Sequence, residues 1–232
     1  MKHYPLFYPY IPRQAILKEL RETLSGRYLG QGPKVNKFEE EFNKKFGYQY
    51  SVFLNSGTSA LELAYHLIGI KSGDEVIVPV LDAPAGQVGL VRRGAKIVFV
   101  DIERGTLNLD PDDLQRNITP KTKAIVAVHL GGVAVNKKVF EIAKERNIPI
   151  IVDLAQDMDP QSGKYGDYLI YSFQAIKAIT TADGGMLVVR SKAEYDRAKK
   201  LRWFGIDREK RNRNNWKKRE MTFNIEEAGY KF

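Results

Sequence analysis

A lysine and a serine lie in the stretch SFQAIKAITTADGG, between two apolar runs. Lys177 follows Ser172 by five residues, and the flanking runs at 168–171 and 186–189 are typical of buried strands. A lysine in such a connection is usually a solvated surface residue. A desolvated lysine, in contrast, has a lowered pKa and reacts with carbonyl groups as a nucleophile. Lys177 is therefore a candidate for Schiff-base chemistry if other residues supply a binding site beside it.

The short segment NSGTS at 55–59 is a candidate anion site. It follows an apolar run at 50–54 and opens a helical pattern that continues to residue 70. The free N–H groups and the dipole of a helix N-terminus favour anions, and small residues let a phosphate approach the backbone. Ser and Thr are also ordinary helix N-caps. The segment alone leaves both interpretations open.

A carboxylate ends the next informative run, IPIIVD, which is followed by LAQD. Asp153 at this strand end could cap a helix, bind a metal or pair with a cationic ligand group. No second acid or histidine lies at a convincing metal-ligand offset, and Asp157 and Asp159 are more typical of a loop. We therefore expect no metal site.

Together these three features predict one cofactor. Pyridoxal 5'-phosphate needs an anion site for its phosphate, an acid beside its ring nitrogen and a lysine for its aldehyde. Ligands of open parallel sheets bind at the carboxyl ends of the strands. The segment at 55–59, Asp153 and Lys177 all lie at such predicted ends.

The elements that must position these residues alternate along the chain. Several apolar runs are continuous rather than alternating, as expected for strands buried on both faces of a mostly parallel sheet. We expect strands at 50–54, 75–80, 96–100, 124–128 and 148–152, and helices at 12–25, 35–46, 59–70, 85–93, 111–116 and 137–146. The predicted fold class is α/β, with helices in layers on both sides of the sheet.

Composition excludes several other classes of protein. The chain has 232 residues, 43% of them hydrophobic and 28% charged, which is ordinary for a globular protein. It contains no cysteine, so disulfide frameworks and thiolate nucleophiles are excluded. No apolar run approaches the roughly 20 residues that cross a bilayer, and the N-terminus lacks a signal-peptide core. We expect a cytoplasmic protein without a membrane partner.

The net charge of +9 is concentrated in one segment. DREKRNRNNWKKR at 207–219 carries seven Lys or Arg residues and two acids. Such a run is usually a solvated loop. Binding of a phosphate-bearing small ligand is the next interpretation, and nucleic acid comes third because no nucleic-acid-binding motif accompanies the run. We expect no nucleic-acid partner.

Several blocks of the sequence, in order, resemble the sugar aminotransferases of the DegT/DnrJ/EryC1/StrS family. They are GPKVNKFEEEF, NSGTSAL, GDEVIVP, GAKIVFVDI, ITPKTKAIVAVH, SFQAIKAITTADGG and LRWFGID. The resemblance implies the large domain of an aspartate aminotransferase-like enzyme that depends on pyridoxal phosphate. It divides the chain into an N-terminal arm and helix at 1–30, the cofactor-binding domain at 31–205, and a basic loop at 206–232. That loop would lead toward a small C-terminal domain that lies beyond this chain.

The resemblance also implies roles for individual residues. Lys177 would form the Schiff base and move a proton, Asp153 would pair with the ring nitrogen, and Gln156 would lie beside the ring hydroxyl. The implied phosphate contacts are Gly57, Thr58, Ser59 and Ser172. For His129, at a family-typical strand end, contact with the cofactor and packing beneath it remain open.

The activity implied by the resemblance is amino transfer to a nucleotide-linked keto sugar. Glutamate is the expected donor, and the expected assembly is a homodimer. Some family members use histidine in place of the lysine and dehydrate their substrate, so Lys177 favours transamination. In an active protein the basic run would line a path for the nucleotide diphosphate.

Two features depart from the family pattern. Ala83 stands where the family often has an aromatic residue that stacks on the ring, and Asp82 adds an acid beside it. The absent C-terminal domain is the second departure. Both favour the alternative of a catalytically silent binding or assembly protein. This alternative is opposed by four intact residues: Lys177, Asp153, Gln156 and Ser172.

Overall fold

The structure, a computed structural model, describes residues 9–26, 28–208 and 225–232. Its helices are α1 (Arg13–Leu24), α2 (Pro33–Phe46), α3 (Gly57–Ile68), α4 (Ala85–Arg92), α5 (Pro111–Asn117), α6 (Lys137–Glu145) and α7 (Lys192–Leu201). Its strands are β1 (Tyr50–Leu54), β2 (Glu75–Pro79), β3 (Lys96–Val100), β4 (Thr122–Val128), β5 (Ile150–Asp153), β6 (Tyr168–Ser172) and β7 (Gly185–Val189). The expected strands and helices are all present, with small shifts at their ends.

The described residues form one seven-stranded sheet with the order β1-β7-β6-β5-β4-β2-β3. The strands from β3 to β6 pair in parallel, and β7 is antiparallel to both of its neighbours. In this arrangement β1, β2, β4, β5 and β6 all end at the same edge, where β7 begins. Leu54 pairs with Gly185, and Ser172 also pairs with Gly185, so three chain segments meet there.

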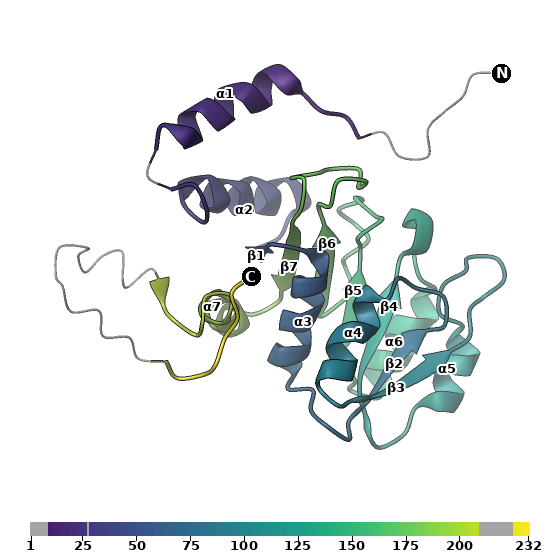
Figure 1. Cartoon of the computed structure of the whole chain (residues 1–232). Coiled ribbons are helices and arrows are strands. Elements are labelled where there is room, and N and C mark those ends of the chain that lie inside the picture. Colours follow the sequence, from purple (N-terminus) through teal and green to yellow (C-terminus); the bar gives the residue numbers. More distant parts are fainter. Residues whose placement is uncertain (1–8, 27, 209–224) are drawn as a thin grey trace, which may run out of the picture.

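Helices cover both faces of the sheet, which gives the three layers that the sequence predicts (Figure 1). One face packs on α3, α4 and α7 and forms the largest apolar cluster. The other face is covered by α5 and α6 over β2 to β5, and by the aromatic side of α2 over β5 to β7. β2, β6 and β7 are buried along their whole length, which explains their continuous apolar sequences.

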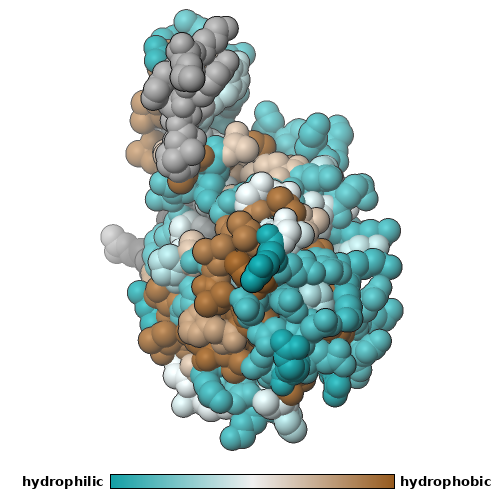
Figure 2. Space-filling model, turned by 90° about the vertical axis from the view of Figure 1, so that its right-hand side faces the viewer, coloured by the Kyte–Doolittle hydropathy of each residue, from teal (hydrophilic) through white to brown (hydrophobic). Residues whose placement is uncertain are grey.

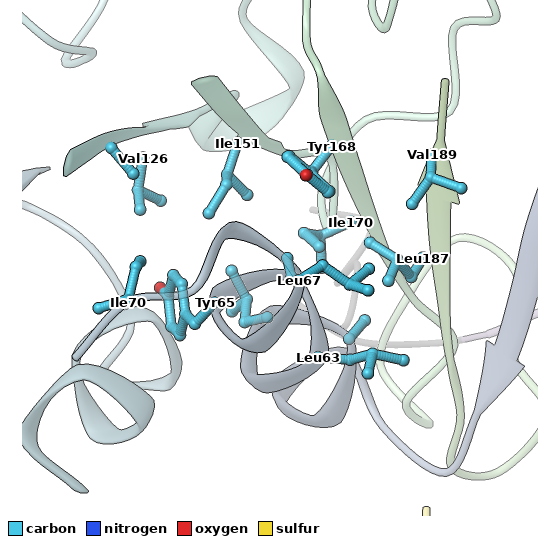
Figure 3. Close-up of a cluster of buried hydrophobic side chains, with 14 of the residues drawn as sticks. Leu63, Tyr65, Leu67, Ile70, Val126, Ile151, Tyr168, Ile170, Leu187 and Val189 are labelled. Atoms are coloured by element: carbon cyan, nitrogen blue, oxygen red, sulfur yellow. The ribbon is translucent and has the colours of Figure 1, made fainter. Parts of the chain in front are cut away.

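Helix α3 is the central helix of the first layer. Ser56 caps it by accepting a hydrogen bond from the N–H of Ser59 at 3.0 Å. Leu63 and Leu67 pack toward Ile170 and Leu187 of the sheet, as Figure 3 shows. This burial fixes the N-terminus of α3 at the edge where the strands end.

A buried ion pair joins the N-terminal and C-terminal parts of the fold. Glu39 of α2 contacts Arg202, which follows α7, with 2.6 Å between Oε1 and NH1. Their side chains are 7% and 3% exposed. Glu39 Oε1 also accepts the N–H of Phe53 at 2.8 Å, and Arg202 NH1 donates to the carbonyl of Phe53 at 2.8 Å. The charged groups thus bind the backbone of β1.

Residues 225–232 return to the main body beside α3 and α7 (Figure 1). Tyr230 donates its N–H to the carbonyl of Leu201 at 2.7 Å, and its hydroxyl lies 2.9 Å from Nδ1 of His66. Glu227 lies 2.6 Å from Nε2 of His66 and also pairs with Arg197. These contacts fasten the described C-terminal segment to the first layer.

Two features of the helices were not expected. Helix α7 was not predicted, because its sequence is strongly polar and only Ala198 and Leu201 are buried. Helix α1 was predicted with an apolar face, and that face exists, but none of its residues is buried. Among the residues that the structure describes, no helix combines the length and apolar character needed to span a membrane.

Candidate active site

A cavity of about 170 Å³ lies at the edge where β1, β4, β5 and β6 end. Six of the seven predicted site residues line it: Gly57, Thr58, Asp153, Gln156, Ser172 and Lys177. They come from the start of α3, the ends of β5 and β6, and the connections that follow these strands. The topology of the sheet therefore gathers residues that are up to 120 positions apart in the sequence.

Lys177 lies in the connection between β6 and β7. Its N–H donates to the carbonyl of Gln174 at 2.9 Å, which forms a turn that directs the chain back along the cavity. The residue is half-buried, and its Nζ makes no ion pair within the described residues. The amine is therefore not committed to a protein carboxylate.

Asp153 is the last residue of β5 and is 8% exposed. Its Oδ1 accepts the N–H of Ala155 at 2.8 Å. Burial raises the pKa of Asp153, while the N–H of Ala155 and the nearby Lys177 and His129 oppose this shift. A cationic ligand group beside this carboxyl would stabilise its ionised form.

Small residues bring α3, β6 and β7 into very close contact. A Cβ atom on Gly57 would lie 3.1 Å from the Cβ of Ser172. A Cβ on Gly185 would lie 2.2 Å from the carbonyl oxygen of Ser56, so only glycine fits there. As a result, the hydroxyl group of Ser172 lies beside the N-terminus of α3, an arrangement suited to an anion.

Gln156 and His129 are held by their own hydrogen bonds. Gln156 Oε1 accepts the N–H of Gly131 at 2.8 Å, which leaves its amide NH2 as a donor on the cavity side. His129 is buried, does not line the cavity, and lies 2.8 Å through Nδ1 from Asp157 Oδ2. The backbone N–H of His129 donates to the backbone carbonyl of Asp153 at 3.0 Å. In this structure His129 packs behind Asp153.

The pair of residues that departs from the family pattern also lines the cavity. Ala83 contributes only a methyl group to the wall. Asp82 beside it is partly buried, and burial together with the negative charge of Asp153 raises the pKa of Asp82 to about 6. Asp82 thus lies close enough to Asp153 for the two carboxyl groups to influence each other's ionisation.

Some predicted residues lie elsewhere. Ser59 does not line the cavity, because its hydroxyl group donates to Oδ1 of Asn55 at 2.6 Å. Most of the basic run at 207–219 lies outside the described residues. Within the described ranges, no group of three or more His, Asp or Glu side chains is arranged to hold a metal.

Sequence reasoning also missed two polar residues of the cavity wall, Gln174 and Asp183. Both lie in the connection between β6 and β7, on either side of Lys177. Gln174 lies two residues after the end of β6, and this position could have identified it as a residue of the cavity wall. Nothing in the sequence showed that the exposed Asp183 would turn toward the cavity.

The arrangement combines three chemical capacities in one cavity. It offers a cation-stabilising carboxyl at Asp153, an uncommitted amine at Lys177, and an anion-binding corner at Gly57 and Ser172. Such a set can hold an anionic aromatic aldehyde with a basic ring nitrogen. The close approach at Gly57 is consistent with a phosphate against the backbone.

The chain resembles known proteins over almost its full length. A Bacillus subtilis relative, spore coat polysaccharide biosynthesis protein SpsC, is 34% identical over 98% of this chain and 59% of its own length. GDP-perosamine synthase of Escherichia coli O157:H7 is 36% identical over 89% of this chain and 58% of its own length. The chain thus spans about three fifths of the curated relatives that it matches.

Solved structures agree with the sequence relatives. The putative sugar aminotransferase Spr1654 from Streptococcus pneumoniae, in its PMP form, superposes with a TM-score of 0.88 and 28% identity. The match covers 98% of this chain and 63% of that protein. Residues 11–232 match the sequence model of the DegT/DnrJ/EryC1/StrS aminotransferase family. The chain therefore belongs to the DegT/DnrJ/EryC1/StrS aminotransferase family.

Proposed function

We propose that this chain carries the cofactor site of a pyridoxal phosphate-dependent aminotransferase that acts on a nucleotide-linked keto sugar. The observation that carries the proposal is the convergence of Lys177, Asp153 and the Gly57–Ser172 corner in one cavity. The named relatives support the same class, because one is a GDP-perosamine synthase and one a putative sugar aminotransferase.

Each residue has a distinct role in this proposal. Lys177 would hold the aldehyde of the cofactor, and its amine would be placed to accept and return a proton of the substrate. Asp153 would hold the protonated ring nitrogen. Gln156, whose Oε1 already accepts the N–H of Gly131, would have its amide NH2 left to donate to the ring hydroxyl. Ser172, with Gly57 and Thr58 at the start of α3, binds the phosphate. The bound cofactor would supply an electron sink for carbanion chemistry.

Ser59 acts in this site through its neighbours. Its N–H donates to Ser56 Oγ, and its hydroxyl group donates to Asn55. Both contacts fix the turn that presents Gly57 and Thr58 to the phosphate. We therefore propose that Ser59 belongs to the cofactor site as the residue that orders this turn.

We further propose that residues 31–205 are the cofactor-binding domain, that 1–30 form an N-terminal arm, and that 206–232 follow as a basic connection. A cytoplasmic location is consistent with a chain that has no cysteine and a cofactor made inside cells. Glutamate is proposed as the amino donor and a nucleotide sugar as the acceptor. The basic segment would contact the nucleotide diphosphate.

We propose a homodimer because two large apolar surfaces are exposed. On α1 the exposed side chains are Ile16, Leu17, Leu20 and Leu24, between 44% and 65% exposed. Around α4 they are Val80, Leu81, Val88, Val91 and Phe99. Figure 2 looks onto the side of the molecule that carries α4 and β3, and hydrophobic surface gathers there in one area. Such patches mark protein interfaces.

Sedimentation equilibrium tests the dimer. We expect a mass near twice 26.4 kDa at micromolar concentration. Val91→Asp should shift the protein to the monomer, because it places a charge in the apolar area. Lys144→Asp introduces an acid at an exposed position of α6, in the other layer, and should leave the dimer intact. A parent protein that sediments only as a monomer would contradict the homodimer.

The amino-transfer proposal is tested by the absorption spectrum of the purified chain with pyridoxal phosphate. We expect a yellow band that disappears when glutamate is added, with formation of 2-oxoglutarate and pyridoxamine phosphate. A band that ignores glutamate would mean that the cofactor site exists without catalysis. Absence of any band would favour the silent binding protein instead.

A further inference from the structure

Asp82 lies between β2 and α4 and lines the same cavity as Lys177 and Asp153, yet the proposed function gives it no role. Its Oδ1 accepts the N–H of Ala83 at 2.6 Å. Its Oδ2 is buried and has no hydrogen-bond partner in the part of the chain that the structure describes. A buried carboxylate oxygen without a partner is energetically costly, so the ionised form of Asp82 is unfavourable in this arrangement.

The local packing creates space for this carboxyl group. A Cβ atom on Gly86 would lie 3.0 Å from Asp82 Oδ2 and 4.0 Å from the hydroxyl oxygen of Tyr65. The Tyr65 hydroxyl group donates to the carbonyl of Gly86 at 2.6 Å and is therefore already committed. Asp82 thus packs against Gly86 and the neutral Tyr65 rather than against a cation of the described residues.

The charged and titratable groups around Asp82 are mostly acidic. Asp153 on β5 lines the same cavity, and burial and the charge of Asp153 raise the pKa of Asp82 to about 6. The N–H of Ala83 and the side-chain amide of Gln87 on α4 oppose this shift without cancelling it. On α3, Tyr65 is the neutral group beneath it, and Glu62 lies 2.7 Å from Arg93 in an ion pair of its own. Arg93 therefore pairs with Glu62 and does not neutralise the carboxylate of Asp82.

The positive groups of the cavity face Asp153 instead. Lys177, which lines the cavity, opposes the raised pKa of Asp153, and so does His129 from behind the cavity wall, whereas neither contributes to the shift of Asp82. The exposed Asp183 adds a further acid at the rim. Within the described residues, Asp82 and Asp153 therefore form a pair of carboxyl groups in which Asp153, but not Asp82, is influenced by the charge of Lys177.

We propose that Asp82 is a positioning residue that shares the cationic end of the bound ligand with Asp153 and releases its proton when that ligand binds. The inference rests on the proposed function, because the cationic end is the protonated ring nitrogen of the cofactor. Ala83 leaves room on this side, since it covers the cavity wall with a methyl group only. The proton leaves from the carboxyl group of Asp82 to solvent, and no covalent bond changes.

This linkage has a definite direction. A cation within about 4–6 Å lowers the pKa of a carboxyl group by about one or more, so the complex binds fewer protons than the free chain. Ligand affinity then rises as the pH increases through 6, by about tenfold if the ligand lowers the pKa of Asp82 by one. Below about pH 4 Asp82 is protonated in both states, and its contribution to the affinity disappears.

The test is the affinity of 4-deoxypyridoxine 5'-phosphate, measured by calorimetry from pH 5 to 8 for the parent and for Asp82→Asn. This probe has the ring and phosphate but no aldehyde, so its binding does not depend on reaction with Lys177. We expect the ratio of the two Kd values, variant over parent, to rise from about two at pH 5 to about ten at pH 8. At pH 6 the parent should release about half a proton more than the variant.

Three controls separate this effect from others. Asp159→Asn removes an equal charge at a position that does not line the cavity and should keep the pH dependence of the parent. Gly86→Ala keeps Asp82 but pushes a methyl group against its Oδ2, and it should weaken the dependence. With 3-hydroxybenzyl phosphate, which has no ring nitrogen, the Kd ratio should not rise with pH.

Equal pH profiles for the parent and Asp82→Asn would overturn the inference but leave the proposed function intact. If the parent binds neither this probe nor pyridoxal phosphate, the proposed function itself fails. If Asp82→Asn does not fold, its circular dichroism will show this. The pH dependence of Gly86→Ala then tests the inference, and a dependence equal to that of the parent would overturn it.

Discussion

Replacing Asp153 by Asn should slow the reaction of cofactor-loaded protein with glutamate by on the order of 10²–10³-fold, the usual cost of one preorganised electrostatic group. The Asn side chain has almost the same shape and can still accept the N–H of Ala155 through its Oδ1. It carries no negative charge, so it does not stabilise a protonated ring nitrogen. The loss should therefore appear in the rate and in cofactor affinity without loss of the fold.

The measurement is stopped-flow absorption at saturating glutamate. Asp159→Asn is the matched control, because Asp159 lies in the same connection, accepts the N–H of Gln161 at 2.9 Å and does not line the cavity. This variant should react at the parent rate. An Asp153→Asn protein that reacts as fast as the parent would remove Asp153 from the proposed site.

Replacing Glu39 by Gln should reduce the free energy of unfolding by about 3–5 kcal/mol, the usual result of leaving one member of a buried ion pair without its partner. Gln can still accept the N–H of Phe53 through its Oε1, so the hydrogen bond to β1 survives. Arg202, whose side chain is 3% exposed, keeps its hydrogen bond to the carbonyl of Phe53 but then carries a buried charge without an opposite charge beside it. Against a typical total stability of about 5–15 kcal/mol this is a large fraction.

Urea unfolding followed by circular dichroism measures this loss. The exposed pair of Lys137 and Glu141 on α6 supplies the control, and Glu141→Gln should leave the unfolding midpoint unchanged. Adding Arg202→Met to Glu39→Gln should recover part of the stability, because the unpaired charge is gone. A loss below about 1 kcal/mol for Glu39→Gln would show that solvent reaches Arg202.

Most of the fold could be predicted from the sequence, because strands that are buried on both faces require continuous apolar runs. β2 and β4 are examples, and the order of strands and helices followed from such runs. Helix α7 escaped prediction because it buries only one narrow edge, and its polar sequence resembles a loop. The antiparallel direction of β7 was also not readable, since direction depends on the connection at 173–184.

The candidate site was predictable where residue type and strand end coincide. Lys177, Asp153 and Ser172 satisfied both conditions, and the structure gathers them in one cavity. The partners that tune them were not predictable. The contact of His129 with Asp157 and the burial of Asp82 against Gly86 depend on how separate connections pack. Such contacts have no periodic signal in the chain.

The most direct test of the account is to locate the cofactor. The protein would be incubated with pyridoxal phosphate, reduced with borohydride, digested and analysed by mass spectrometry, beside Lys177→Ala. We predict a single reduced adduct on Lys177 in the parent and none in the variant. An adduct on a different lysine, or labelling that survives Lys177→Ala, would contradict the assignment of this cavity as the cofactor site.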